Sequence, residues 1–150
     1  MTYQPRGRTF DQFELDEVIS TARRTITEAD IVNFAGQAGD YNPLHTDEEF
    51  AKETPFGTRI AHGMLVASVA TGLANQLGVF EGTTIALMEQ VIRYRGAVLP
   101  GDTIHLELRV AEKKETSKPD RGVLTVETVV KNQRDETVIE GQWVLLMRRG

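Results

Sequence analysis

The sequence contains no cysteine among its 150 residues, which excludes disulfide bonds, a thiol nucleophile and zinc sites built from thiolates. Positive charge is also scarce, because 17 Lys and Arg stand against 22 Asp and Glu and form no basic block. Proteins that bind nucleic acids need clustered cations to displace phosphate counterions. We therefore expect no nucleic-acid partner, and the absence of cysteine fits a reducing compartment.

A secretory signal is also missing, because no apolar stretch follows the arginines near the N-terminus. Residues 60–80 carry no charge unless His62 is protonated, and this segment is long enough to cross a bilayer. It nevertheless contains many small and polar residues, namely Gly63, Ser68, Thr71, Gly72, Asn75, Gln76 and Gly78. This composition favours a helix buried in protein, so we expect a soluble, cytoplasmic protein with no membrane segment.

The overall composition is that of a globular protein, with 40% hydrophobic and 26% charged residues. A chain of this length suits one domain with its own core. No repeat, low-complexity tract or linker divides it, so we predict a single domain over residues 1–150. Residues 1–14 are polar, and we expect them to be flexible or only partly ordered.

The first part of the chain predicts a strand followed by a short helix. Residues 18–25 are expected to form the strand. Thr27 and Asp30 then resemble a capping box, with Asp in place of the usual Glu. Apolar residues follow at helical spacing, and Gly39 is suited to end the helix.

The next part predicts a loop, a helical turn and the longest helix. Residues 40–45 form the loop, which Pro43 stiffens, and residues 47–52 form the turn. The long helix is predicted over residues 62–77. It is apolar almost all round, so we expect it to be buried on most sides.

The second half of the chain predicts antiparallel strands over residues 85–95, 103–110, 123–130 and 137–147. Alternation is clearest in residues 103–110, where every second residue is aliphatic, as expected for a half-buried strand. A long apolar helix needs a large surface to cover it. We therefore predict an α+β fold in which a curved antiparallel sheet wraps around one long helix.

Two residues of the predicted loop are suited to proton transfer. Asp40 and His45 lie close in sequence in a segment stiffened by Pro43, so their side chains can converge. Histidine titrates near neutral pH, and a nearby carboxylate can hold a water molecule and share the proton. The alternative is structural, with Asp40 capping a turn and His45 bonding locally.

The start of the long helix is a second candidate site. Unpaired N–H groups at a helix N-terminus are suited to stabilise an oxyanion, and Gly63 would let a ligand approach its backbone closely. Alternatively, Gly63 only permits close packing. We expect His62 to orient the loop rather than to transfer protons.

Three polar residues, Ser68, Thr71 and Asn75, fall on one face of the same helix. Their spacing leaves two interpretations open. Either the side chains bond back to helix carbonyls, as Ser and Thr often do, or they form a polar stripe that faces a pocket.

These features together resemble the MaoC-like dehydratases, the (R)-specific enoyl-CoA hydratases. The resemblance rests on Asp-Tyr-Asn-Pro-Leu-His-Thr-Asp at residues 40–47 and His-Gly-Met-Leu-Val-Ala-Ser at residues 62–68. It continues from Tyr94 to Asp102, where the family has an aromatic residue and then a Gly-Asp turn. Ala97 stands where the family usually has proline, which weakens the match at one strand edge only.

The resemblance implies a hotdog fold, a homodimer or a hexamer of dimers, and reversible hydration of a trans-2-enoyl thioester. Asp40 and His45 would hold and activate the water, and the N–H of Gly63 would bind the developing oxyanion. The substrate would be carried by coenzyme A or by acyl carrier protein. No metal and no separate cofactor are expected, because coenzyme A is part of the substrate.

Further residues receive supporting roles from the same resemblance. Thr71 matches a family serine whose hydroxyl bonds the active-site aspartate, and Asn42 and His62 would support the loop. Independently of the resemblance, Arg93 and Arg95 share one face of their predicted strand, where they would either contact coenzyme A phosphates or be ordinary surface cations. Two alternatives remain open: a non-catalytic acyl-binding module or partner subunit, and a thioesterase, although the long helix lacks the carboxylate that hotdog thioesterases usually carry there.

Overall fold

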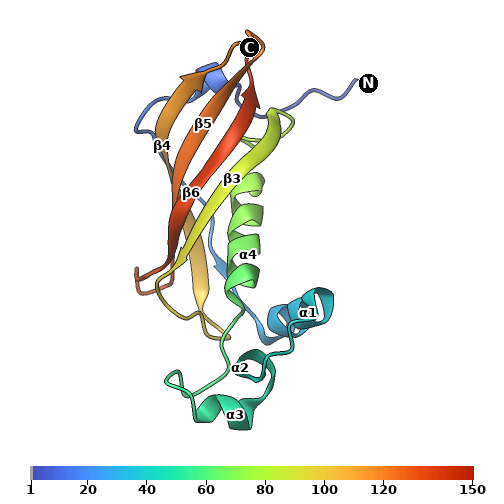
Figure 1. Cartoon of the computed structure of the whole chain (residues 1–150), viewed down its shortest axis with the longest axis vertical. Helices are drawn as coiled ribbons and strands as arrows, with labels where there is room; N and C mark the ends of the chain where they lie inside the picture. Colours follow the sequence, from blue (N-terminus) through green and yellow to red (C-terminus); the bar gives the residue numbers. More distant parts are fainter. Residues whose placement is uncertain (1) are drawn as a thin grey trace.

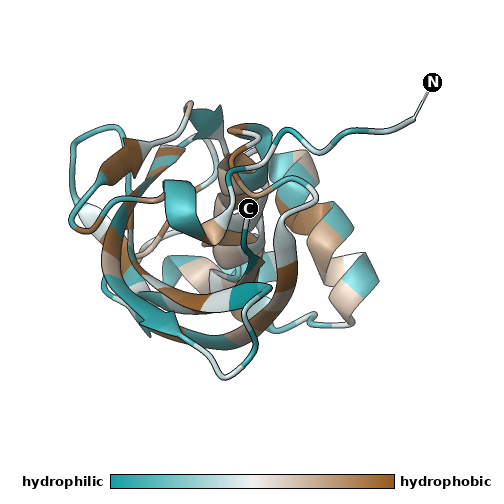
Figure 2. Ribbon diagram, turned by 90° about the horizontal axis from the view of Figure 1, so that it is seen from above, coloured by the Kyte–Doolittle hydropathy of each residue, from teal (hydrophilic) through white to brown (hydrophobic). Residues whose placement is uncertain are grey.

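The computed structural model describes residues 2–150 and shows an antiparallel sheet curved around one long helix (Figure 1). The strand order is β1-β4-β5-β6-β3, with β2 also paired to β4, so β3 forms an edge of the sheet. Figure 2 looks along the helix and shows the sheet bent around it. The predicted α+β arrangement is confirmed. The strands are β1 (Val18–Ser20), β2 (Arg24–Thr25), β3 (Thr84–Tyr94), β4 (Thr103–Glu115), β5 (Arg121–Lys131) and β6 (Thr137–Arg148).

The helices lie on one face of the sheet and beyond one end of it. The long helix α4 lies against the concave face, and α1, α2 and α3 gather beyond its N-terminal end (Figure 1). Within the described part of the chain, no helix is long and apolar enough to span a bilayer. The helices are the 3-10 turn η1 (Phe10–Gln12), α1 (Glu28–Ala38), α2 (Pro43–Thr46), α3 (Glu48–Lys52) and α4 (Gly63–Gln76).

The core lies between α4 and the sheet. The predicted alternation in β4 is confirmed, because its aliphatic residues are all buried: Ile104, Leu106, Leu108 and Val110. They pack with the inner face of α4, formed mainly by Leu65, Val66, Val69, Ala70, Leu73 and Ala74. The small residues among these allow the strands to approach the helix closely.

The ends of α1 agree with the sequence. The side chain of Thr27 accepts a hydrogen bond from the Asp30 N–H, and the Asp30 carboxylate accepts one from the Thr27 N–H. Gly39 ends the helix with φ of 76°, a left-handed conformation that costs glycine little. This sharp stop delivers the chain directly into the segment that contains Asp40.

The predicted strand over residues 18–25 is divided into β1 and β2. The interruption begins at Thr21, whose hydroxyl accepts a hydrogen bond from the Leu106 N–H in place of a main-chain carbonyl. The hydroxyl also donates to the carbonyl of Ala22. This local bonding competes with the regular ladder, which sequence alternation cannot reveal.

The N-terminal segment is packed more closely than the sequence indicates. Partial order is predicted for residues 1–14, of which Met1 lies outside the described residues. Phe10 and Phe13 are both buried, and Lys113 lies over the ring of Phe10. The main-chain N–H groups of Gly7 and Arg8 pair with the turn that precedes β3. The two phenylalanines supply this packing within an otherwise polar segment.

The long helix is less buried than predicted. Its bounds are close to the predicted residues 62–77, but Met64, Ser68, Gly72 and Asn75 are exposed along its outer face. The sheet lies along one side of α4, and β3 is an edge strand with no neighbour beyond it among the described residues.

Candidate active site

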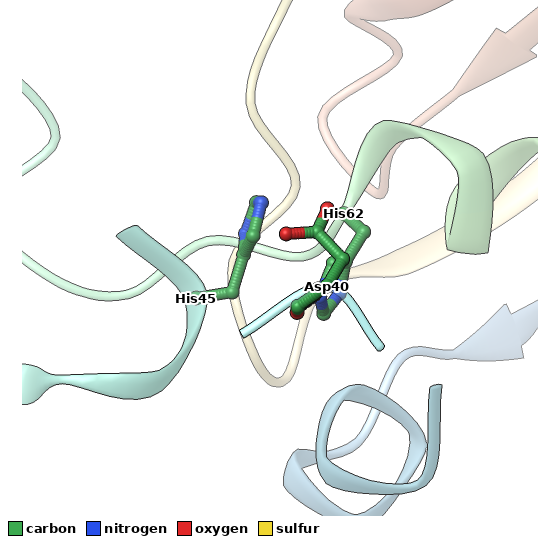
Figure 3. Close-up of side chains that lie close together, drawn as sticks. All are labelled: Asp40, His45 and His62. Carbon is green, nitrogen blue, oxygen red and sulfur yellow. Dashed lines mark hydrogen bonds between the residues drawn. The ribbon is translucent and has the colours of Figure 1, made fainter. Parts of the chain in front are cut away.

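The predicted loop over residues 40–45 contains the helical turn α2, because two sequence signals begin a helix there. Asn42 caps α2 by accepting a hydrogen bond from the Leu44 N–H, and Pro43 occupies the first helical position. Asp40 precedes the turn, and its carboxylate accepts a hydrogen bond from the Asn42 N–H at 3.2 Å. The turn places His45 on the same side as the Asp40 carboxylate (Figure 3).

His45 is buried and held in one orientation. Its Nδ1 lies 2.7 Å from the main-chain carbonyl oxygen of Ile60. A carbonyl can only accept a hydrogen bond, so we assign the proton of neutral His45 to Nδ1. The lone pair of Nε2 is then available to accept a proton from a bound molecule.

His62 lies directly before α4 and connects the two halves of the site. Its Nε2 lies 3.0 Å from the main-chain oxygen of Asp40, to which it donates. Its ring stacks on that of His45, with centroids 3.9 Å apart and planes at 27°. Phe34 of α1 packs on it with centroids 4.9 Å apart. The expected orienting position of His62 thus agrees with its contacts, while its Nδ1 is buried without a hydrogen-bond partner among the described residues.

Gly63 begins α4 beside this pair. The first N–H groups of a helix have no partner within the helix, and no side chain caps this one. The ring of Tyr94 packs against Gly63, so that a Cβ atom added there would lie 2.4 Å from Cε1 of the ring. The nearest signal of this contact in the sequence is an aromatic residue, Tyr94, that precedes the Gly-Asp turn. It does not indicate which residue the ring contacts.

A cavity of about 510 Å³ unites these groups. Its polar lining comes from Asp40, His45, His62 and Arg95, and the glycines Gly63 and Gly96 add main chain. Most of the remaining wall is hydrophobic, so the cavity suits a ligand that is largely apolar with one polar group. The hydrophobic and aromatic lining residues are Leu44, Phe56, Ile60, Ala61, Met64, Val66, Tyr94, Ala97, Val98 and Ile139.

Asp40, His45 and His62 are also the residues that come nearest to a metal site. One ligand atom from each lies within 4.8 Å of the others. The two imidazole rings are stacked, however, and each already uses one ring nitrogen to donate to a main-chain carbonyl. We therefore assign these residues no role as metal ligands, and the absence of a cofactor stays a prediction.

The predicted contact between Thr71 and Asp40 is not formed within this chain. Thr71 lies two turns beyond the start of α4 and does not line the cavity. Its hydroxyl donates to the carbonyl of Ala67, and Ser68 and Asn75 likewise bond back to carbonyls one turn earlier. Of the two interpretations of this stripe, back-bonding within the helix is the one that agrees with the structure.

The two arginines expected near coenzyme A are placed differently. Arg95 lies just beyond the end of β3, lines the cavity and pairs with Glu140 at 2.6 Å. Arg93 is exposed on β3 and is not part of the cavity lining. The structure thus brings together Asp40, His45, His62, Gly63 and Arg95, and leaves Arg93 and Thr71 outside.

Comparison with known proteins identifies the family. Residues 12–132 match the model of the MaoC-like domain, and the chain belongs to this family. The resemblance noted in the sequence is therefore confirmed.

The chain is similar to several enzymes of this family. It is 34% identical to 3-hydroxybutyryl-CoA dehydratase from Methylorubrum extorquens, over 80% of this chain and 72% of that protein. It is 33% identical to an (R)-specific enoyl-CoA hydratase from Rhodospirillum rubrum, over 83% of this chain and 81% of the relative. It is 39% identical to Protein MaoC of Klebsiella aerogenes over 78% of this chain, but spans only 34% of that longer protein.

Solved structures agree with this assignment. A protein described as a monoamine oxidase regulatory protein from Archaeoglobus fulgius superposes with a TM-score of 0.89 at 38% identity, over 96% of both chains. A Mycobacterium tuberculosis protein with a double hotdog fold superposes with a TM-score of 0.84 over 99% of this chain and 46% of that one. At 18% identity the latter comparison shows the fold alone, and it confirms that the fold is the hotdog.

Proposed function

We propose that the protein is an (R)-specific enoyl-CoA hydratase, which adds water reversibly to a trans-2-enoyl thioester and, in reverse, dehydrates a 3-hydroxyacyl thioester. The observation that supports this most is the position of Asp40 and His45 at the polar end of an apolar cavity, next to the first turn of α4. Relatives named as hydratases and dehydratases support the reaction class.

In the proposed reaction, Asp40 and His45 hold one water molecule between them. Nε2 of His45 accepts a proton from this water as its oxygen bonds to C3 of the substrate. The electrons of the C2–C3 double bond move towards the thioester oxygen, and C2 then receives a proton from the Asp40–His45 pair. Each turnover therefore adds one water and returns both side chains to their starting state.

The negative charge that develops on the thioester oxygen needs a hydrogen-bond donor. The N–H of Gly63 is proposed for this role, because it belongs to the unpaired first turn of α4 and lies at the positive end of the helix dipole. With this donor and the Asp40–His45 pair, the proposed reaction needs no metal and no cofactor. Coenzyme A enters only as part of the substrate.

Arg95 is the better placed of the two candidates for contact with coenzyme A. Its guanidinium group lies at the cavity and is about half exposed, and Glu140 is its present partner. A phosphate of coenzyme A could replace this carboxylate and accept two parallel hydrogen bonds from the guanidinium group. Acyl carrier protein offers a phosphate on its prosthetic group as well, so both carriers remain within the proposal.

The proposed assembly is a homodimer, or a hexamer of such dimers. The support comes from β3, an edge strand whose first half exposes Ile85, Leu87 and Met88. An uncovered apolar edge strand is prone to pair with another chain. A cytoplasmic location stays a prediction from the sequence.

One assay distinguishes the proposed activity from its alternatives. Crotonyl-CoA is mixed with the protein while the ultraviolet absorbance of the conjugated enoyl thioester and the release of free thiol are both recorded. Loss of the absorbance without thiol is the expected result. Thiol release would indicate a thioesterase, which is disfavoured because α4 contains no Asp or Glu. Binding without either change would indicate an acyl-binding module.

A further inference from the structure

Tyr94 is the last residue of β3, and its ring packs on the first residue of α4. A Cβ atom added to Gly63 would lie 2.4 Å from Cε1 and 2.7 Å from Cζ of this ring. Non-bonded carbon atoms do not approach so closely, since their optimal separation is about 3.5–4.0 Å. The ring therefore occupies the space that any side chain at position 63 would fill.

The backbone of Tyr94 is fixed while its ring is comparatively free. In the sheet, Tyr94 pairs with Ile139 of β6, and both residues line the cavity. The side chain is 52% exposed, and the one hydrogen-bond partner of its hydroxyl among the described residues is the thioether sulfur of Met64, at 3.4 Å. Sulfur is a weak acceptor, so this bond adds little to the packing of the ring on Gly63.

We propose that Tyr94 is a substrate-binding residue that forms one wall of the thioester subsite. This inference rests on the proposed function, because it takes the N–H of Gly63 as the donor to the thioester oxygen. The flat ring lies beside that N–H and packs against the bound thioester. It also keeps water away from the donor, and a hydrogen bond is stronger where water is excluded.

The contact also gives a second reason for glycine at position 63. If glycine were present only to let the ligand reach the backbone, the space at its Cβ position would be open. The ring of Tyr94 fills that space instead. Positions 63 and 94 are therefore coupled, and a side chain at 63 must displace the ring from the subsite.

Binding and turnover test the role of the ring. Tyr94→Ala and Tyr94→Phe are compared with the wild type by calorimetry with butyryl-CoA, a saturated thioester that cannot be hydrated, and by kinetics with crotonyl-CoA. Tyr94→Ala should raise Kd and KM by about tenfold, as expected for the loss of one aromatic packing contact. Tyr94→Phe keeps the ring and should stay within about twofold of the wild type.

Tyr3→Ala is the matched control, because Tyr3 is 67% exposed and bonds Glu81 instead of lining the cavity. It should leave both constants unchanged. Wild-type Kd and KM in Tyr94→Ala would overturn the proposal. Equal losses in Tyr94→Ala and Tyr94→Phe would overturn it too, because the hydroxyl and not the ring would then matter.

Thermal unfolding tests the coupling without any assay of activity. Gly63→Ala must push the exposed ring of Tyr94 aside, and because the ring can swing away, Tm should fall by no more than about 4 °C. In the Tyr94→Ala background the same substitution should leave Tm unchanged or raise it, because alanine favours a helix more than glycine does. Equal effects in the two backgrounds would show that the positions are independent and would contradict the proposal.

The outcomes separate this inference from the proposed function. A wild type that binds butyryl-CoA but does not hydrate crotonyl-CoA refutes the hydratase activity and leaves the role of Tyr94 standing if Tyr94→Ala weakens binding. A wild type that hydrates crotonyl-CoA with unchanged constants in Tyr94→Ala refutes the inference alone. A wild type that binds no butyryl-CoA refutes the thioester subsite.

Discussion

The imidazole rings of His45 and His62 stack with their centroids 3.9 Å apart, although His45 lies in α2 and His62 directly before α4, in separate sequence motifs. His62 also donates to the main-chain oxygen of Asp40. A single buried side chain therefore contacts both members of the proposed catalytic pair. His62 therefore helps to hold Asp40 and His45 in their relative positions.

His62→Phe should keep the stack on His45 but lose the hydrogen bond to Asp40. We expect the protein to fold and kcat with crotonyl-CoA to fall by about tenfold or more, because small misplacements of a catalytic group are costly. The loss of stability should be partly offset, because phenylalanine removes the buried Nδ1 that has no hydrogen-bond partner among the described residues.

His62→Gln serves as the complementary variant, since its amide can donate to the same carbonyl but cannot stack. Comparing kcat and Tm of the two variants separates the hydrogen bond from the ring contact. If both variants keep wild-type kcat, His62 has no positioning role.

The donor role of Gly63 is best tested where Tyr94 no longer interferes. In the Tyr94→Ala background, Gly63→Ala retains the N–H and Gly63→Pro removes it. Proline is tolerated in the first turn of a helix, so both proteins should fold. Losing one oxyanion donor typically lowers turnover by about 10²–10³-fold, and the proline variant should show this loss relative to the alanine variant.

The quantity to measure is kcat per folded molecule, with the folded fraction taken from circular dichroism. Equal kcat for the alanine and proline variants would remove the support for an oxyanion role of this N–H.

Arg59 joins α1 and α3 to the segment that carries the His45 acceptor Ile60. Its guanidinium pairs with Glu28 of α1 and, at 2.6 Å, with Glu48 of α3. The hydrogen bond from Arg59, supported by one from Thr58, holds the pKa of Glu48 below its ordinary value of 4.5. A depressed pKa means that Glu48 stabilises the fold when ionised, and that this contribution is lost as pH falls through the folded-state pKa.

Glu48→Gln should therefore destabilise the protein at neutral pH, and the difference from wild type should shrink as pH falls below about 4.5. Urea unfolding at a series of pH values measures it. High salt should reduce the neutral-pH difference, because Glu48 is partly exposed. A difference that stays constant from neutral to acid pH would show that the ion pair does not contribute.

The edge strand β3 should form the interface between two copies of the chain. Sedimentation equilibrium at micromolar concentration should give at least twice the mass of one chain. Leu87→Lys places a charge on this exposed edge and should shift the protein towards the monomer. Val32→Lys, at an exposed position of α1, is the control and should leave the mass unchanged. A wild type that sediments as a single chain contradicts the predicted dimer.

Local patterns predicted most of the fold. The alternation of β4, the capping box at Thr27 and the glycine at position 39 each depend on neighbours in sequence, and each is found as predicted. The division of the first strand was missed, because it depends on the bond between Thr21 and Leu106, which are far apart in the chain.

The site was predicted in its residue types but not in its contacts. The proximity of Asp40 and His45 follows from one short segment, whereas the packing of Tyr94 on Gly63 depends on how the end of β3 meets the start of α4. The expected bond from Thr71 to Asp40 also depends on packing, since within this chain Thr71 lies two turns into α4, outside the cavity lining, and donates to Ala67. Sequence motifs indicate which chemical groups are present, whereas tertiary packing determines which side chains contact one another.

The central claim is that Asp40 takes part in proton transfer during hydration. The most direct test is kcat of Asp40→Asn with crotonyl-CoA, measured on protein whose Tm and butyryl-CoA affinity are close to those of the wild type. In the proposed reaction His45 takes the proton of the water and the Asp40–His45 pair returns one to C2, and the amide keeps the size of Asp40 but cannot take part in that return. The account predicts a loss of about 10²–10⁴-fold in kcat, whereas near wild-type turnover by the folded variant would contradict it.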